Sequence, residues 1–253
     1  MNIYQPSFFD EAERLIKLTK LKDPLEALKQ HIDFEIFRPQ LEAVFSKDKK
    51  SAAGRKAYDV VLMFKILILQ RLYNLSDEQA EFQINDRQSF QRFLGMHLGS
   101  TVPDFSTVWL FREALTVAEV IKPLFDTYGA ILEKQGVVTK AGTIVDASFV
   151  EVPRQRNTRE ENELIKQGQP PPEWENQPHK LSQKDLDARW TKKNHETFYG
   201  YKNHIRADAE SAIITDYTVT DAAVHDSQAL PELIGPDNKG HFEQSRFGKK
   251  SPI

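Results

Sequence analysis

The chain has 253 residues, which is long enough for one large or two small domains with a buried core. Its hydrophobic content of 40% is typical of a globular protein, and the absence of cysteine excludes disulfides, thiolate zinc sites and cysteine nucleophiles. A formal net charge of −3 does not indicate a nucleic-acid-binding protein, although a local basic face is enough to engage phosphates.

The N-terminal segment does not have the pattern of a signal peptide, because residues 1–20 are charged throughout and lack an apolar core. The longest apolar stretch, residues 60–69, is interrupted by Lys65 and has about half the length that spans a bilayer. We therefore expect no membrane partner, and the lack of cysteine fits a cytoplasmic location.

Residues 1–136 carry the pattern of a helical domain. Tyr58–Leu75 is the strongest helix prediction because it is apolar on most faces, as expected of a central helix. Ser76 followed by Gln79 predicts a capping box at the start of the next helix. The other helices are expected over residues 10–21, from 24, around 34–45, over 86–95, from about 104 or 106, and over 117–135.

From Val137 onward the pattern changes to that of strands. Residues 142–152 include a β-branched run and are bounded by a glycine and a proline, which favours a buried strand. Further strands are expected over residues 200–208 and 212–221, followed by a helix over residues 225–234. The predicted fold class is therefore α+β.

This order of elements predicts two domains, one at residues 1–136 and one at residues 137–253. Between the first two strands, residues 154–195 are rich in polar and charged side chains and contain three consecutive prolines. No hydrophobic core can be built from this composition, so we expect an exposed, partly disordered insertion. The tail after Ile234 has too few apolar residues to supply another strand and helix.

Asp146 interrupts the first apolar strand and is the leading candidate for a functional residue. A carboxylate there is costly to bury unless it is paired or binds a metal. Carboxylates on rigid strands hold the two divalent ions of metal-dependent phosphoryl transfer, whereas an edge-strand aspartate that faces solvent has no such role. The residues alone leave both interpretations open.

Two other sets of residues have either a functional role or a purely structural one. His225 and Asp226 would bind a metal or act as a base, but Asp226 or Ser227 more commonly caps the helix that follows. A second group on short helices would form a helix-turn-helix-like unit, although charged helix faces are usually solvated. Its members are Gln88, Arg92, Thr107, Trp109 and Arg112.

Basic and aromatic residues gather before and within the second strand. Lysine and arginine bind phosphates, and tyrosine and tryptophan stack on unpaired bases, so this hairpin is a candidate nucleic-acid interface. The alternative is a solvated sheet edge that lysines protect from pairing with another chain. The residues are Arg189, Trp190, Lys192, Lys193, Tyr199, Tyr201, Lys202, His204 and Arg206.

Several motifs together resemble the DDE transposases of bacterial insertion sequences, in the class grouped with insertion sequences four and five. Residues 103–115 (PDFSTVWLFREAL) are similar to part of the family's helical N-terminal domain. Residues 142–157 (GTIVDASFVEVPRQRN) are similar to its first catalytic strand, and residues 187–234 to the next two strands and helix. The resemblance covers nearly the whole chain and implies the front half of an RNase H-like catalytic domain.

The resemblance implies a transposase that binds the double-stranded terminal repeats of its element. Such enzymes catalyse DNA transposition by metal-dependent phosphodiester hydrolysis and strand transfer, and a homo-oligomer on the DNA is compatible with this role. Asp146 would be the first catalytic aspartate and a ligand of Mg²⁺ or Mn²⁺. The expected DNA contacts of the basic hairpin are Lys192, Lys193, Tyr201, Lys202, His204 and Arg206.

The chain departs from the family pattern after the helix at residues 225–234. Family members continue into a strand that bears a second aspartate and, later, a helix that bears a glutamate. Asp237 is separated from Ile234 by two residues, which leaves no room for a strand of the usual length of about five residues. We therefore expect a C-terminally truncated copy, and the alternative function is a catalytically inactive DNA-binding remnant that interferes with intact transposase.

Overall fold

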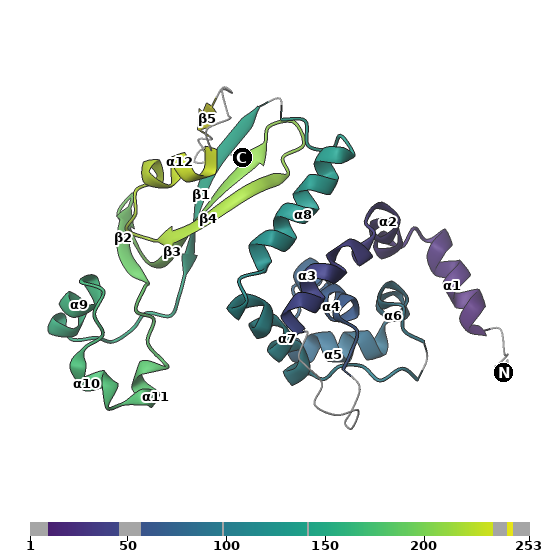
Figure 1. The fold of residues 1–253 in the computed structure, drawn as a ribbon, viewed down its shortest axis with the longest axis horizontal. Coiled ribbons are helices and arrows are strands. Elements are labelled where there is room, and N and C mark those ends of the chain that lie inside the picture. Colours follow the sequence, from purple (N-terminus) through teal and green to yellow (C-terminus); the bar gives the residue numbers. More distant parts are fainter. Residues whose placement is uncertain (1–9, 46–56, 98, 141, 235–241, 245–253) are drawn as a thin grey trace. The chain divides into compact units, whose positions relative to one another are not determined.

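The computed structural model describes residues 10–45, 57–97, 99–140, 142–234 and 242–244 (Figure 1). The chain divides into two compact units, Met1–Thr127 and Tyr128–Ile253, and the division falls inside one helix. Helices form the first unit and an antiparallel sheet dominates the second, so the predicted α+β class is confirmed.

The first unit is built around its most apolar helix. Its elements are α1 (Asp10–Lys20), α2 (Pro24–His31), the 3-10 helix η1 (Phe34–Phe37), α3 (Arg38–Phe45), α4 (Val60–Tyr73), α5 (Asp77–Asp86), α6 (Gln88–Leu94), α7 (Phe105–Val117) and the start of α8 (Ile121–Lys134). Helix α4 contacts η1, α3, α5, α6 and α7, which explains why its sequence is apolar on most faces. Ile66 and Leu69 of α4 are fully buried, together with Leu41 and Phe93.

Local capping signals set the helix boundaries in this unit. The predicted capping box is present, because Ser76 Oγ accepts from the Gln79 amide and the Gln79 side chain accepts from the Ser76 amide. Asp104 Oδ1 accepts from the Thr107 amide at 2.8 Å and caps α7. Gly95 ends α6 in the left-handed conformation, as its position after the apolar run predicts.

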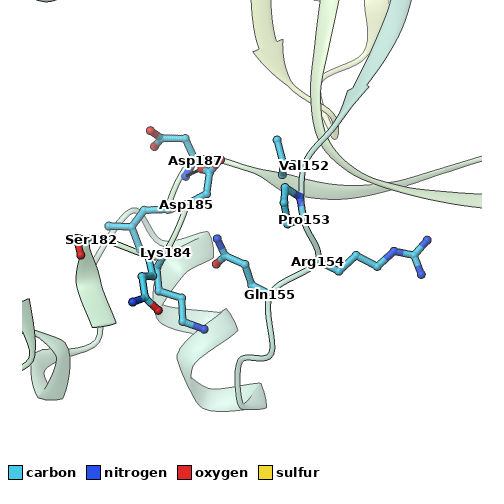
Figure 2. A pocket seen from close by; sticks show the side chains of 10 residues that line it. Val152, Pro153, Arg154, Gln155, Ser182, Lys184, Asp185 and Asp187 are labelled. Carbon is cyan, nitrogen blue, oxygen red and sulfur yellow. Dashed lines mark hydrogen bonds between the residues drawn. The ribbon is translucent and has the colours of Figure 1, made fainter. Parts of the chain in front are cut away.

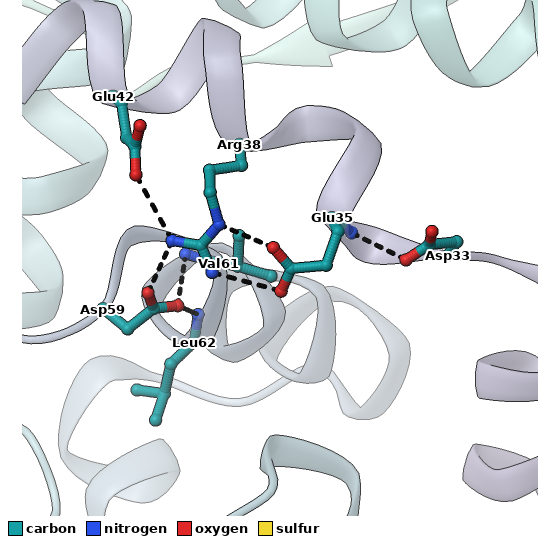
Figure 3. A network of polar contacts seen from close by, with 7 residues as sticks. All are labelled: Asp33, Glu35, Arg38, Glu42, Asp59, Val61 and Leu62. Carbon is teal, nitrogen blue, oxygen red and sulfur yellow. Dashed lines mark hydrogen bonds and ion pairs between the residues drawn. The ribbon is translucent and has the colours of Figure 1, made fainter.

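An ion-pair network joins η1 and α3 to the start of α4 (Figure 3). The Arg38 guanidinium binds the Glu35 carboxylate through two nitrogens and also contacts Glu42 and Asp59. Asp59 in turn accepts from the amides of Val61 and Leu62 and so caps α4. Three carboxylates surround this one cation, so the network links helices and is not a site for a negatively charged ligand.

The second unit contains a five-stranded sheet. Its strands are β1 (Thr143–Glu151), β2 (Arg189–Lys193), β3 (Glu196–Asp208), β4 (Ile214–Asp221) and β5 (Phe242–Gln244). Strand β3 pairs antiparallel with β1, β2 and β4, and β1 also pairs parallel with β5. Strand β1 therefore lies in the interior of the sheet, paired with β3 along one side and with β5 along the other.

The sequence predicts that the tail after Ile234 cannot supply a further strand and helix together, and among the described residues it supplies one short strand, β5. Strand β5 pairs with the first three residues of β1, in the register Thr143 opposite Phe242. A short ladder of this kind needs backbone hydrogen bonds and little apolar sequence, which is why composition did not predict it. Asp237 lies outside the described residues.

The insertion is also more ordered than its composition predicts. It contains α9 (Arg159–Lys166), α10 (Pro172–Glu175) and α11 (Pro178–Leu181). Trp174 is 0% exposed, and its indole N–H donates to Glu161 at 2.9 Å while the ammonium groups of Lys180 and Lys184 lie over its ring. The buried Trp174 and Ile165 supply a small core that a count of apolar residues does not reveal.

Helix α12 (Asp226–Ile234) packs on one face of the sheet, against β3 and β4. The sequence predicts that Asp226 or Ser227 caps it, and that assignment is wrong. His225 takes this role, because its Nδ1 accepts from the Ser227 amide at 3.3 Å. The Asp226 carboxylate is instead paired with Lys202.

Candidate functional site around Asp146

Asp146 lies in the middle of β1, opposite Ile205 of β3. Its side chain is half-buried, and its Oδ1 accepts a hydrogen bond from the Ala147 amide at 2.9 Å. No lysine or arginine among the described residues forms an ion pair with it. The strand therefore fixes a carboxylate in the sheet interior without a cationic side chain to neutralise it.

The register of the sheet shows which side chains share a face with Asp146. Residues directly opposite each other in antiparallel strands project to the same face, and successive residues alternate. Asp146 and Ile205 therefore belong to one face, which we call the Asp146 face. Lys202 and Arg206 belong to the other, the α12 face, because both side chains contact α12 or the loop before it.

Three of the predicted DNA contacts point into the protein on the α12 face. The Lys202 side chain is 11% exposed, and its ammonium donates to the Val224 carbonyl at 2.6 Å and pairs with Asp226 at 3.0 Å. Arg206 donates to the Leu233 carbonyl at 2.8 Å, at the end of α12, and lies 3.6 Å from Asp216. Both cations hold α12 on the sheet, because Lys202 binds the Val224 carbonyl just before the helix and Arg206 binds the Leu233 carbonyl in its last turn.

His204 lies between these two cations and is 1% exposed. Its Nε2 is 2.9 Å from the Thr220 hydroxyl, and burial lowers its pKa below the usual value. A side chain buried to this extent is not accessible to DNA in this structure, which argues against the predicted DNA contact at His204. The sequence identified a basic strand, but the period of two placed its cations on the covered face.

The other predicted contacts lie near the β2–β3 turn and on the Asp146 face. Lys192 and Lys193 of β2 are both exposed, and the Lys193 ammonium lies 5.6 Å from the centre of the Phe149 ring. Lys192 is opposite Thr197 and therefore belongs to the Asp146 face. Tyr201 belongs to the same face, and its hydroxyl donates to Asp185 at 2.6 Å.

Asp185, which the sequence analysis did not single out, borders a cleft of about 790 Å³ where the insertion joins the sheet (Figure 2). Burial raises the pKa of Asp185, but hydrogen bonds from Tyr201 and two backbone amides outweigh it and lower the pKa overall. Burial and this carboxylate together raise the pKa of Tyr201. Arg154 and Lys184 line the cleft together with Asp185 and Asp187, so its charges cancel. In the sequence, the only feature that points to this cleft is the pair of aspartates, Asp185 and Asp187, just before the basic hairpin.

The described residues near Asp146 supply only some of the ligands that a divalent cation needs. Asn203 lies on the same face, opposite Ser148, and its Oδ1 is buried without a hydrogen-bond partner. A carboxylate and an amide oxygen are ligands that Mg²⁺ accepts. However, no group of three acidic, histidine or cysteine side chains that would hold a metal occurs in the described part of the chain. The residues described do not form a complete metal site, and we derive no catalytic step through one.

The arginines of the helix-turn-helix-like group have partners within the first unit. Arg92 pairs with Glu26 at 2.8 Å and donates to Thr19, and Arg112 pairs with Asp77. Trp109, in contrast, is 50% exposed on α7. The arginines thus join helices of the unit, and the group retains an exposed aromatic side chain.

Two family models match separate parts of the chain. Residues 13–114 match the model of a family described as a transposase domain. Residues 139–240 match the model of a family described as a transposase DDE domain. No solved structure matches the chain. No described helix is long and apolar enough to cross a membrane.

Proposed function

Because the chain belongs to the DDE transposases of insertion sequences, we propose that it binds the double-stranded ends of its element and catalyses phosphodiester hydrolysis and strand transfer. A DDE domain has an RNase H-like fold, and enzymes of this family generally use divalent metal ions. The assignment to the class of insertion sequences four and five stays a prediction.

The observation that carries this proposal is the position of Asp146. A carboxylate in the middle of an interior strand is held rigidly, and rigid placement is what metal-dependent phosphoryl transfer requires of its ligands. We propose Asp146 as the first catalytic carboxylate and as a ligand of Mg²⁺ or Mn²⁺. We assign residues 137–253 to the catalytic domain and residues 1–136 to recognition of the element ends.

We propose fewer DNA contacts in the sheet domain than the sequence predicts. Lys192 and Lys193 are exposed near the turn between β2 and β3, where phosphates reach them. Lys202 and Arg206 are engaged with α12, and Tyr201 with Asp185. We therefore retain the two lysines of β2 as phosphate contacts of the sheet domain.

A cleavage assay tests the proposal. Purified protein is incubated with a labelled duplex that carries the element's end, in the presence of Mg²⁺ or Mn²⁺. Asp146→Asn keeps the shape of the side chain and removes its charge, so it should abolish strand cleavage while DNA binding persists. Glu151→Gln on the exposed end of the same strand is the matched control and should cleave normally.

The outcomes separate the candidate functions. Cleavage that is lost in Asp146→Asn and kept in Glu151→Gln supports the enzyme. Binding of the duplex by the wild type without cleavage assigns the chain to the alternative, a catalytically inactive DNA-binding protein. A wild-type protein that neither binds nor cleaves the duplex contradicts both.

A further inference from the structure

A second cleft lies between helix α9 of the insertion and the β2–β3 hairpin. Its volume is about 790 Å³, within the range of about 300 to 1,000 Å³ that is usual for small-ligand sites. The side chains that line it include two aromatic rings, two amides and two exposed cations. They are Trp190, Tyr199, Asn157, Asn162, Arg159 and Lys166.

Trp190 is the distinctive residue of this cleft because a large aromatic ring is 47% exposed there. The ring centres of Trp190 and the buried Tyr199 are 4.8 Å apart, and the Arg154 guanidinium lies over the Trp190 ring at 5.5 Å. Tyr199 and Arg154 therefore position the indole, while 47% of the surface of the Trp190 residue stays exposed. An exposed ring held in this way is a platform for a flat ligand.

The walls of the cleft are fixed relative to each other. Arg189 of β2 donates to the Ile165 carbonyl of α9 at 3.0 Å and to the Leu186 carbonyl at 2.6 Å. These partners, and the Ala188 carbonyl at 3.1 Å, are neutral, so Arg189 forms no hydrogen bond to a carboxylate, although its charge acts on nearby Asp185 and helps to lower the pKa of that carboxyl. The same contact that joins α9 to the hairpin thus adds to the positive charge of the site.

The charge of this cleft favours an anionic ligand. Arg159, Lys166 and Arg189 supply three cations, and Glu163, which pairs with Lys166 at 2.9 Å, supplies one carboxylate. The neighbouring cleft in Figure 2 has two aspartates against two cations. Of the two clefts, the one at Trp190 therefore combines an aromatic platform with an excess of positive charge.

Two of the residues that line the cleft, Trp190 and Tyr199, belong to the same face of the sheet as Asp146. Trp190 is opposite Tyr199, which is six residues before Ile205, the residue opposite Asp146. At about 3.3 Å per residue, the two sites are about 20 Å apart along β3. A few nucleotides of an extended single strand span this distance.

We propose that the cleft between α9 and the β2–β3 hairpin binds an unpaired nucleotide of a DNA strand, with the base stacked on Trp190 and phosphates near Arg159 and Lys166. The proposal rests on the proposed DNA-binding function. It adds a site for single-stranded DNA, which a duplex without unpaired bases does not occupy.

The test compares two probes, a fluorescent oligothymidylate and a fully paired duplex of the same length. Trp190→Ala should weaken binding of the oligothymidylate by roughly 5- to 150-fold, the range for one base–aromatic stack, and leave duplex binding unchanged. Trp190→Phe retains a ring and should recover most of the affinity. Ile214→Ala removes an apolar side chain that is 42% exposed on β4 of the same unit, outside the cleft, and should bind both probes like the wild type.

An abasic scan shows whether a base is in contact with Trp190. The probe is a duplex with a short single-stranded extension that carries one abasic nucleotide at each position in turn. The wild type should lose affinity at one position, and Trp190→Ala should show no further loss there. If Trp190→Ala binds every probe as tightly as the wild type, the proposal is overturned even when duplex binding and cleavage are intact. If the wild type binds no DNA, the proposed function fails as well.

Discussion

The two faces of the sheet are built from the same strands but differ in what their polar residues do. On the α12 face, Lys202 and Arg206 are engaged with groups of the helix or the loop before it, and His204 is buried against Thr220. On the Asp146 face, a half-buried carboxylate has no cationic partner among the described residues, and Val150 and Val219 are exposed. The polar side chains of the α12 face are thus bound to other groups of the protein, whereas the Asp146 carboxylate on the other face has no cationic partner in the described part of the chain and can bind a ligand.

The difference shows how little a basic sequence motif reveals about a binding surface. Lys202, His204 and Arg206 are separated by one residue each, so a strand places all three on one face. Because that face carries α12, the most basic part of the strand stabilises the fold. The cations that remain for DNA are those near the β2–β3 turn and on α9.

The largest effect should come from the core of the insertion, which supplies one wall of the Trp190 cleft. Trp174→Ala removes a fully buried ring and should destabilise the insertion by about 3 to 5 kcal/mol. Limited proteolysis should then cut within residues 159–187, and binding of single-stranded DNA should fall. Trp109→Ala, at an exposed position, should leave the digestion pattern unchanged. Equal resistance of Trp174→Ala and the wild type would show that this core does not hold the insertion together.

The next largest effect should be on the α12 face. Lys202→Ala leaves the Val224 carbonyl and the Asp226 carboxylate without their partner and should lower the free energy of unfolding by about 2 kcal/mol. Lys193→Ala, which removes an exposed lysine, should change it by no more than about 0.5 kcal/mol. Urea denaturation measures both. Equal values for the two variants would mean that Lys202 does not hold α12.

The stability of the second unit should also depend on pH through His204. Burial lowers the pKa of this histidine in the folded state below its unfolded value of 6.5. The unfolded state therefore binds the proton more readily, so stability is fully present above pH 6.5 and is lost as the pH falls below it. The slope is at most about 1.4 kcal/mol per pH unit for one proton.

Urea denaturation between pH 7 and pH 5 measures this dependence. His204→Gln retains a hydrogen-bonding group near Thr220 and cannot titrate, so it should flatten the curve in this range. His195→Gln, in the exposed turn between β2 and β3, should leave the curve as in the wild type. A curve that His204→Gln does not alter would assign the acid sensitivity to other groups.

The smallest effect should be on the salt dependence of DNA binding. If Lys192 contacts one phosphate, Lys192→Ala should lower the slope of log K against log salt concentration by about 0.9 on duplex DNA. Lys192→Arg keeps the charge and should keep the slope. An unchanged slope in Lys192→Ala would remove this residue from the DNA interface.

The helices of the first unit were predictable from the sequence because their signals are local. The Ser76–Gln79 capping box, the Asp104 cap and the apolar helix α4 each depend on residues a few positions apart. The strand that carries Asp146 was predictable for the same reason, since its β-branched residues and flanking breakers are adjacent in the chain. These signals located the candidate carboxylate without knowledge of its neighbours.

The surroundings of these elements were decided by contacts between residues far apart in the chain. The register of β3 against β1 and β4 placed Lys202 and Arg206 under α12, and it placed Asn203 on the face of Asp146. Strand β5 joins the sheet through backbone pairing with β1. The insertion, whose composition predicts disorder, contains the fully buried Trp174. A sequence determines where a strand runs and which side chains alternate along it, but the face that becomes a site depends on which partners cover the other one.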